Sequence, residues 1–254
     1  MGKIISISNQ KGGVGKTTTA VNLAASLAAA EKRTLLIDID PQGNACSGVG
    51  VEKDQLKNTI YNVIIGEIDI FDAVKKTDLA YLDLVPSNSH LTGAELELVS
   101  ASSRERKLKT ALDKVLPDYD YIIIDSPPSL GLLTVNALTA AASVIVPLQC
   151  EFYAMEGLAK IIKTIELIKE SLNPDIYIEG ILLTMFDRRN NLSFQVAKEV
   201  RSHFNGQVFD SVIPRNVRLS ESPSHGKPVL LYDIASKGAT SYLDLAKEIM
   251  GRSH

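Results

Sequence analysis

The chain has 254 residues, and its 27 Lys and Arg residues against 30 Asp and Glu residues give a formal net charge of −3. This balance argues against a protein that condenses nucleic acid through bulk charge, and an apolar fraction of 45% excludes disorder. Two cysteines and four histidines in no ligand-like spacing argue against a disulfide framework or a structural metal. The sequence shows neither an apolar run of membrane-spanning length nor a signal-peptide pattern, so we expect a cytosolic protein.

Short apolar, β-branched runs alternate with helical patterns along the chain. The expected strands are Lys3–Ser8, Thr34–Asp38, Leu82–Val85, Tyr121–Asp125, Ser143–Leu148, Glu179–Thr184 and Val208–Ile213. The expected helices are Thr17–Ala30, Ser103–Leu116, Ala154–Leu172, Leu192–Phe204 and Ser241–Met250. Several strands are apolar at nearly every position, which is typical of parallel strands covered on both faces. We therefore predict an α/β fold in which residues 1–254 form a single doubly wound domain, with helices on both faces of a mostly parallel sheet of about seven or eight strands.

A glycine-rich segment between the first strand and the first helix predicts a phosphate-binding loop, and with it a P-loop NTPase. Its glycines let backbone N–H groups surround phosphates, Lys16 supplies positive charge, and the Thr17 hydroxyl suits Mg²⁺. The usual first glycine of the motif is replaced by Gln10, and a second lysine follows it. The candidate nucleotide-binding residues of the loop are Lys11, Gly12, Gly13, Val14, Gly15, Lys16, Thr17 and Thr18.

Three aspartates stand where two of the expected strands end. Asp38 and Asp40 close the second strand, and their spacing points both side chains to the same side of an extended chain. Asp125 ends the strand Tyr121–Asp125. Because ligands of parallel α/β sheets bind at the carboxyl ends of the strands, these carboxylates predict positions for Mg²⁺ and for the attacking water.

Four motifs in order resemble those of the ParA/Soj chromosome- and plasmid-partitioning ATPases, from Lys3 to about Ile249. They read QKGGVGKTT, IDIDPQGN, YIIIDSPPSLG and IPRNVRLSESPSHGKP. The family belongs to the deviant Walker A group, which also contains the division-site ATPase MinD. The resemblance implies ATP and Mg²⁺ as cofactors and a homodimer in the ATP-bound state.

The resemblance also gives individual residues a role. Lys11 corresponds to a signature lysine that reaches the ATP of the partner subunit, and Asp40 to the aspartate that orients the attacking water. Lys16 and Thr17 correspond to the phosphate and Mg²⁺ residues. The resemblance further implies that Asp38 and Asp125 hold Mg²⁺ through its waters and that the adenine lies against Pro214 and Asn216.

A basic C-terminal third is hidden by the overall charge. Residues 184–254 contain 10 Lys and Arg against 7 Asp and Glu, a net of +3, whereas residues 1–183 carry 17 against 23, a net of −6. Arg189 and Arg218 lie in this part, at positions where the resemblance places nonspecific DNA binding. A surface of this kind contacts phosphates without reading sequence.

The resemblance implies an ATP-driven switch for chromosome or plasmid partitioning. The expected protein is a Mg²⁺-dependent ATPase that is weak until stimulated by a ParB/Spo0J-type centromere-binding protein and that associates with the nucleoid. The main alternative is a MinD-like membrane-cycling ATPase, although the expected helix Ser241–Met250 lacks a basic amphipathic face. A redox ATPase with a bridging cluster and an ATP-dependent synthetase are further alternatives on the same fold.

Overall fold

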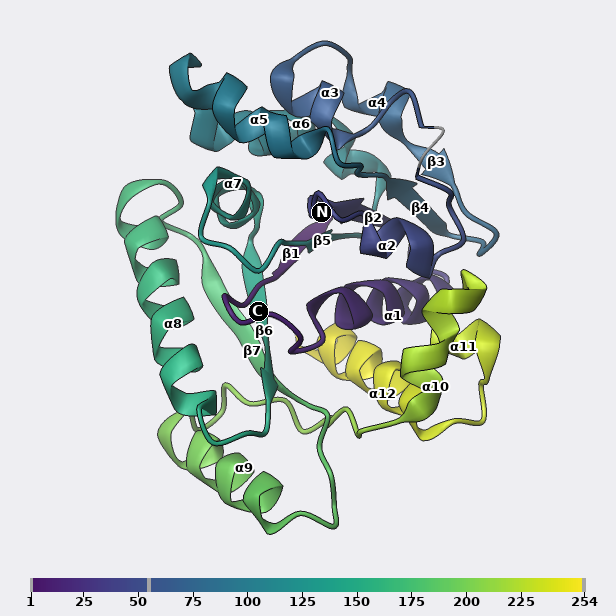
Figure 1. Ribbon diagram of the computed structural model, residues 1–254, viewed down its shortest axis with the longest axis vertical. Coiled ribbons are helices and arrows are strands. Elements are labelled where there is room, and N and C mark those ends of the chain that lie inside the picture. Colours follow the sequence, from purple (N-terminus) through teal and green to yellow (C-terminus); the bar gives the residue numbers. More distant parts are fainter. Residues whose placement is uncertain (1, 54–55, 253–254) are drawn as a thin grey trace.

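One sheet runs through the protein. The computed structural model describes residues 2–53 and 56–252, and in these ranges seven strands pair in the order β3-β4-β2-β5-β1-β6-β7 (Figure 1). The strands are β1 Lys3–Ile7, β2 Thr34–Asp38, β3 Lys75–Lys76, β4 Leu82–Val85, β5 Tyr121–Asp125, β6 Ser143–Gln149 and β7 Tyr177–Thr184. The short β3 pairs antiparallel with β4, and the other pairs are parallel. The predicted mostly parallel sheet is confirmed.

Helices cover both faces of this sheet, as predicted (Figure 1). The α-helices are α1 Lys16–Ala29, α2 Asn44–Gly48, α3 Ile60–Ile65, α4 Ile70–Ala73, α5 Leu91–Glu97, α6 Lys107–Val115, α7 Leu132–Ala140, α8 Ala154–Ser171, α9 Asn191–His203, α10 Val217–Glu221, α11 Val229–Tyr232 and α12 Lys237–Gly251. Alternate residues of one strand enter different cores: Ile5 and Ile7 of β1 pack with α1 and α12, whereas Ile4 packs with α3 to α7. This alternation explains why the strands are apolar at nearly every position.

The predicted strand Val208–Ile213 is wrong. The segment follows the edge of β7, and its Phe209 and Ile213 N–H groups donate to the carbonyls of Ile181 and Leu183 at 3.0 and 2.9 Å. These bonds do not form a continuous ladder, and Val208 makes an isolated bridge to Ile181. The backbone N–H groups of Asp210 and Ser211 donate instead to the carboxylate of Glu248 on α12, at 2.9 and 3.0 Å. Because a helix side chain satisfies these two donors, the pairing with β7 is interrupted between Phe209 and Ile213.

The start of the predicted helix Ser103–Leu116 is also wrong. Ser103 has a left-handed backbone (φ 52°) and makes no capping hydrogen bond; a short 3-10 helix follows, and α6 begins at Lys107. The other predicted helices are present with shifts at their ends. Several helices were not predicted, namely the short α2, α3, α4, α5, α10 and α11 and the longer α7. The short ones give little periodic signal.

The C-terminal helix α12 packs on α1. Its buried face includes Ala239, Tyr242, Leu245, Ala246 and Ile249, and the Tyr242 hydroxyl lies 3.2 Å from Thr19 Oγ1 on α1. The apolar side of α12 is therefore part of the core. Among the described residues, we find no helix with the length and apolar character that crossing a membrane requires.

Candidate nucleotide site

The glycine-rich loop joins β1 to α1 near the middle of the sheet, between β5 and β6 (Figure 1). Gly13 and Gly15 have positive φ angles of 74° and 89°, which a side chain at these positions would strain. Gly15 immediately precedes α1, so the loop leads into the positive end of a helix dipole. The local geometry is therefore that of an anion-binding loop.

Two side chains outside the motif hold the loop in place. Asn9 donates from Nδ2 to the Pro147 carbonyl at 2.7 Å and accepts from the Lys11 N–H at 3.0 Å. Thr184, at the end of β7, donates from Oγ1 to the Val14 carbonyl at 2.9 Å. Sequence analysis missed both residues. Asn9 adjoins the motif and could have been considered, whereas nothing in the sequence near Thr184 indicates that it contacts the loop.

Lys16 lies at the first position of α1 and is buried. Its Nζ donates to the Lys11 carbonyl at 3.0 Å, within the loop. Burial lowers the pKa of Lys16, and the nearby carboxylates of Asp125 and Asp40 oppose this shift. The ammonium group is thus placed between the loop and the strand-end aspartates, as the motif predicts.

Asp38 and Asp125 lie opposite each other at the ends of the neighbouring strands β2 and β5. Both are fully buried, and burial raises the pKa of each carboxyl group. Asp38 accepts hydrogen bonds from the N–H groups of Asp40 and Cys46, each at 3.1 Å. In contrast, neither carboxylate oxygen of Asp125 has a hydrogen-bond donor within 3.5 Å among the described residues, and the Thr17 side chain lies just beyond that distance.

The unsatisfied carboxylate of Asp125 fits a cation site. Burying a charge without a partner costs several kcal/mol, so such a group is retained where a ligand compensates it. Thr17 lies close enough to lower the pKa of Asp125, and carboxylate and hydroxyl oxygens are ligands that Mg²⁺ prefers. The residues predicted to hold Mg²⁺ directly or through water, namely Thr17, Asp38 and Asp125, therefore suit that ion.

Replacing Asp125 with Asn is expected to stabilise the protein in the absence of nucleotide and magnesium. The raised pKa means that the ionised carboxylate destabilises the folded state, and the isosteric amide removes the charge. A gain of about 1–2 kcal/mol corresponds to a rise in Tm of roughly 2–8 °C for a chain of this size. Calorimetry measures the shift, with the exposed Asp175→Asn as control. A lower Tm for Asp125→Asn would contradict the assignment.

Asp40 stands two residues beyond β2 and is 8% exposed. Its Oδ1 accepts from the Gln42 N–H at 2.9 Å, and its backbone carbonyl accepts from the Ser87 hydroxyl at 2.7 Å. These bonds fix the turn and orient the carboxylate. Asp40 also contributes to the electrostatic environment of Lys16 and Asp125, so the three predicted aspartates and Lys16 form one cluster.

Lys11 points away from this cluster. Its Nζ lies 2.8 Å from Oε2 of Glu151, in the segment between β6 and α8, and the other carboxylate oxygen of Glu151 accepts from the Gln149 amide. Lys11 therefore has an intramolecular carboxylate partner, which the sequence did not reveal. Both side chains are close to half-exposed, so the pair is weak and easily exchanged for another anion.

A cavity of about 340 Å³ adjoins the loop. Pro214 and Asn216, the predicted adenine residues, line it together with Gly15 and Thr18 of the loop and Met185 after β7. Asn216 Oδ1 accepts from the Arg218 N–H at 2.8 Å and so caps α10, which leaves the amide nitrogen as a donor. The structure thus brings these residues beside the phosphate loop.

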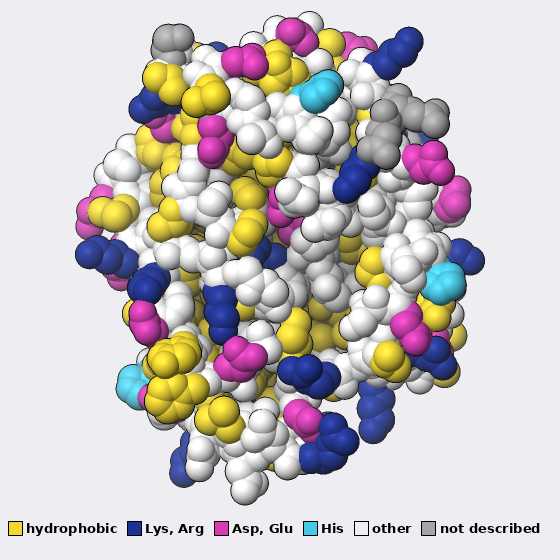
Figure 2. Space-filling view, viewed as in Figure 1, with side chains coloured by type: hydrophobic (Ala, Val, Ile, Leu, Met, Phe, Trp, Pro, Cys, Tyr) yellow, Lys and Arg dark blue, Asp and Glu magenta, His cyan; other side chains and the backbone are white. Residues whose placement is uncertain are grey.

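The arginines predicted to bind DNA are exposed, but each is paired with acids of the same chain. Arg189 lies 3.0 Å from Asp187, and this contact lowers the pKa of Asp187 to about 2. Arg218 lies 2.9 Å from Glu221 and 3.1 Å from Asp233. Figure 2 shows Lys and Arg side chains interspersed with acids along the lower part of this face. Sequence counting missed this local neutralisation.

A groove of about 960 Å³ includes Arg189 and three further basic side chains. These are Arg188, Arg215 and Lys237. Among the described residues, none of the three has a carboxylate within ion-pair distance, whereas Asp187 and Asp244 also line the groove. Four of the ten Lys and Arg residues of the C-terminal third thus lie together in this groove.

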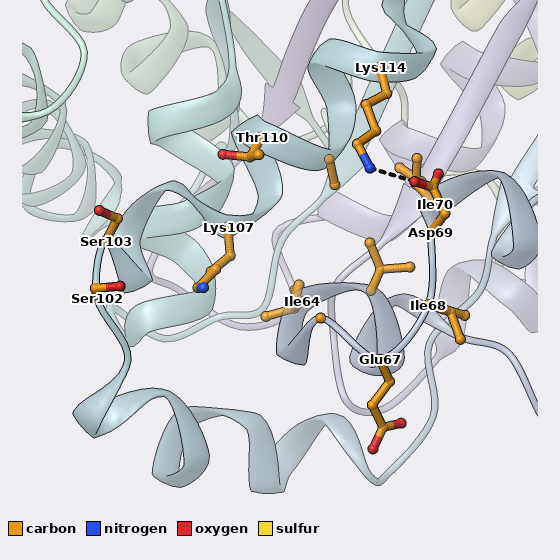
Figure 3. Close-up of a pocket in the computed structure, with 13 residues that line it drawn as sticks. Ile64, Glu67, Ile68, Asp69, Ile70, Ser102, Ser103, Lys107, Thr110 and Lys114 are labelled. Carbon is orange, nitrogen blue, oxygen red and sulfur yellow. Dashed lines mark hydrogen bonds and ion pairs between the residues drawn. The ribbon is translucent and has the colours of Figure 1, made fainter.

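A different cavity, of about 590 Å³, lies between the α3–α4 segment and α6 (Figure 3). Lys114 reaches Asp69 across its edge, while Lys107, Ser102 and Ser103 lie on the other side. It contains none of the loop residues or strand-end aspartates. We therefore do not assign the nucleotide to it.

Comparison with known proteins agrees with this geometry. Residues 2–178 match the model of a family described as "AAA domain". The chain is 60% identical over 252 residues to the chromosome partitioning protein ParA of Myxococcus xanthus, covering 99% of this chain and 89% of that protein. It is 58% identical over 249 residues to the sporulation initiation inhibitor protein Soj of Bacillus subtilis, covering 98% of each. The chain belongs to the ParA/Soj family.

The fold comparison points to the same class. A crystal structure named cobyrinic acid a,c-diamide synthase from Mycobacterium smegmatis, with bound ADP and magnesium, superposes with a TM-score of 0.86 at 38% identity, covering 97% of this chain and 93% of that one. The ParA/Soj family thus shares the P-loop NTPase fold with proteins that bear other functional names. The fold alone therefore does not specify the function, which depends on the residues of the site.

Proposed function

We propose that residues 1–254 act as one Mg²⁺-dependent ATPase unit that switches between two states during chromosome or plasmid partitioning. The observation that carries the proposal is the cluster of Lys16 with Asp38, Asp40 and Asp125 beside the phosphate loop. Within the described part of the chain, no group donates a hydrogen bond of ordinary length to the buried carboxylate of Asp125. Its positive and negative groups are those that phosphoryl transfer requires, because this chemistry depends on positioning and charge. The identity to proteins named ParA and Soj supplies the biological process.

In this proposal the loop N–H groups and Lys16 bind the β- and γ-phosphates. Thr17, Asp38 and Asp125 hold the magnesium ion, which would supply charge neutralisation at the phosphates. Asp40 orients the attacking water through its remaining carboxylate oxygen. The base occupies the cavity lined by Pro214 and Asn216.

Lys11 gives the site its dependence on a second copy. Its ammonium group pairs with Glu151 rather than entering its own site, so it is available to another anion. We infer that in an ATP-bound homodimer each Lys11 reaches the phosphates bound by the other subunit. Hydrolysis then removes the anion that holds the two copies together, and stimulation by a ParB/Spo0J-type protein would control that step.

The dimer is proposed to bind double-stranded DNA without sequence preference and thereby to associate with the nucleoid in the cytoplasm. One copy presents few basic groups, and several of them are paired with acids. Two copies double the number of phosphate contacts, and affinity depends steeply on that number. DNA phosphates would compete with Asp187 for Arg189 and with Glu221 and Asp233 for Arg218.

Replacing Arg189 and Arg218 with Ala should weaken DNA binding equally on any sequence. Each lost phosphate contact is expected to reduce the slope of log affinity against log salt by about 0.9. Filter binding of ATP-loaded protein to two unrelated duplexes across a salt series measures both effects. The control is Arg33→Ala, since Arg33 is also paired with an aspartate, Asp120, but lies before β2, at the opposite end of the strands. Unchanged affinity of the double arginine variant, or a strong preference of the protein for one duplex, would refute nonspecific DNA binding through Arg189 and Arg218.

The membrane-cycling alternative is less well supported. A membrane-targeting helix needs a free apolar face, whereas the apolar face of α12 packs on α1. A synthetase would need a site for a second substrate next to the phosphates. DNA binding with and without ATP separates both alternatives from partitioning.

A further inference from the structure

Two large aromatic side chains lie exposed beside the phosphate loop. Phe152 and Tyr153 are 77% and 66% exposed, and they stand between the end of β6 and the start of α8. Their rings contact each other edge to face, with centroids 5.1 Å apart. Figure 2 shows hydrophobic side chains gathered at the lower left, where α8 begins. Single exposed apolar residues are ordinary, but an adjacent Phe–Tyr pair is typical of an interaction surface.

The position of this pair is fixed relative to the nucleotide loop. Glu151, the preceding residue, holds Lys11 Nζ at 2.8 Å. Gly12, the residue after Lys11, is exposed, and a Cβ built on it would meet nothing within 4 Å. Its backbone φ is not positive either, so nothing within this chain requires glycine at position 12. The lack of a side chain there is explained if another molecule approaches closely.

We propose that Phe152 and Tyr153 are the apolar contact surface through which a second copy of this chain docks on the nucleotide face. This inference rests on the proposed ATP-bound dimer and names the residues that would stabilise it. Whatever brings Lys11 to a second copy also brings the Glu151–Tyr153 segment, because Glu151 and Lys11 are in contact. The symmetry of a dimer would bury both aromatic pairs at once.

The area available is of the right size. A Phe or Tyr side chain buries roughly 150–250 Å² when fully covered. At the observed exposures, two pairs would contribute roughly 400–700 Å² of the approximately 1,200 Å² that a stable interface needs. The glycine loop and its neighbours must supply the rest. Anchors of this type commonly dominate binding energy.

The test uses the double variant Phe152→Ser/Tyr153→Ser in a protein that also carries Asp40→Ala to prevent hydrolysis. Both side chains are exposed, so folding should be unaffected. Analytical ultracentrifugation with saturating ATP and magnesium should show a dimer dissociation constant at least about 100-fold higher than that of the Asp40→Ala parent. The double variant should still bind ATP. Its affinity, measured by titration, should lie within about threefold of the affinity of the Asp40→Ala parent at concentrations where that parent is monomeric.

The matched control is Leu167→Ser, which removes a 56% exposed apolar side chain on α8, more than three turns from the loop. It should dimerise as the parent does. If the double variant dimerises at the same concentration as the parent, Phe152 and Tyr153 are not the contact surface of the dimer, although the dimer itself stands. The pair would then be a contact surface for a different protein. A parent that stays monomeric with ATP would reject the proposed dimer itself and this surface with it.

Discussion

Lys16→Ala is expected to lower the affinity for ATP by at least about 100-fold. The loss follows from the structure, since Lys16 is the buried cation at the start of α1 and lies near the carboxylates of Asp125 and Asp40, which would otherwise repel the phosphates. A charge-assisted contact to phosphate in a buried site contributes several kcal/mol, of which about 2.7 corresponds to 100-fold. Isothermal titration calorimetry with ATP and magnesium measures the change.

The control for this prediction is Lys32→Ala. Lys32 is exposed in the turn between α1 and β2, at the opposite end of the strands from the loop. It should bind ATP as the unchanged protein does. Undiminished ATP binding by Lys16→Ala would refute the assignment of the glycine-rich loop to the nucleotide site.

Asp40→Ala is expected to separate ATP binding from hydrolysis. Hydrolysis should fall by about 100-fold or more, because a positioned general base or water-orienting group contributes that much. ATP affinity should stay within a few-fold, since Asp40 is outside the loop and removing its negative charge does not weaken contacts to phosphate. Phosphate release under single-turnover conditions measures the rate, with the exposed Asp210→Ala as control. Normal hydrolysis by Asp40→Ala would refute the proposal that Asp40 orients the attacking water.

Much of the fold could be predicted because its determinants are local. The strands β2, β4 and β5 have the predicted bounds, since unbroken apolar runs between polar turns define them. The phosphate loop was predictable for the same reason: its glycines, Lys16 and Thr17 are contiguous, and the conformation depends on positive φ angles at Gly13 and Gly15. The strand-end aspartates followed from the rule that parallel strands end at one edge.

Other features depend on contacts between residues far apart in sequence. The segment Val208–Ile213 has the composition of a strand, but Glu248 accepts two of its backbone hydrogen bonds and so interrupts its pairing with β7. Thr184 supports Val14 across 170 positions, and Glu151 pairs with Lys11 across 140. Composition showed a basic C-terminal third but could not show that Arg218 lies between two acids. Such pairings become visible only when the chain is folded.

The proposed switch depends on a change of oligomeric state with bound nucleotide. The most direct test is the mass of Asp40→Ala protein in solution, measured by sedimentation with magnesium alone and with magnesium and ATP. We expect the 27.6 kDa monomer without ATP and twice that mass with ATP. The same mass under both conditions, with ATP binding verified by titration, would contradict the account.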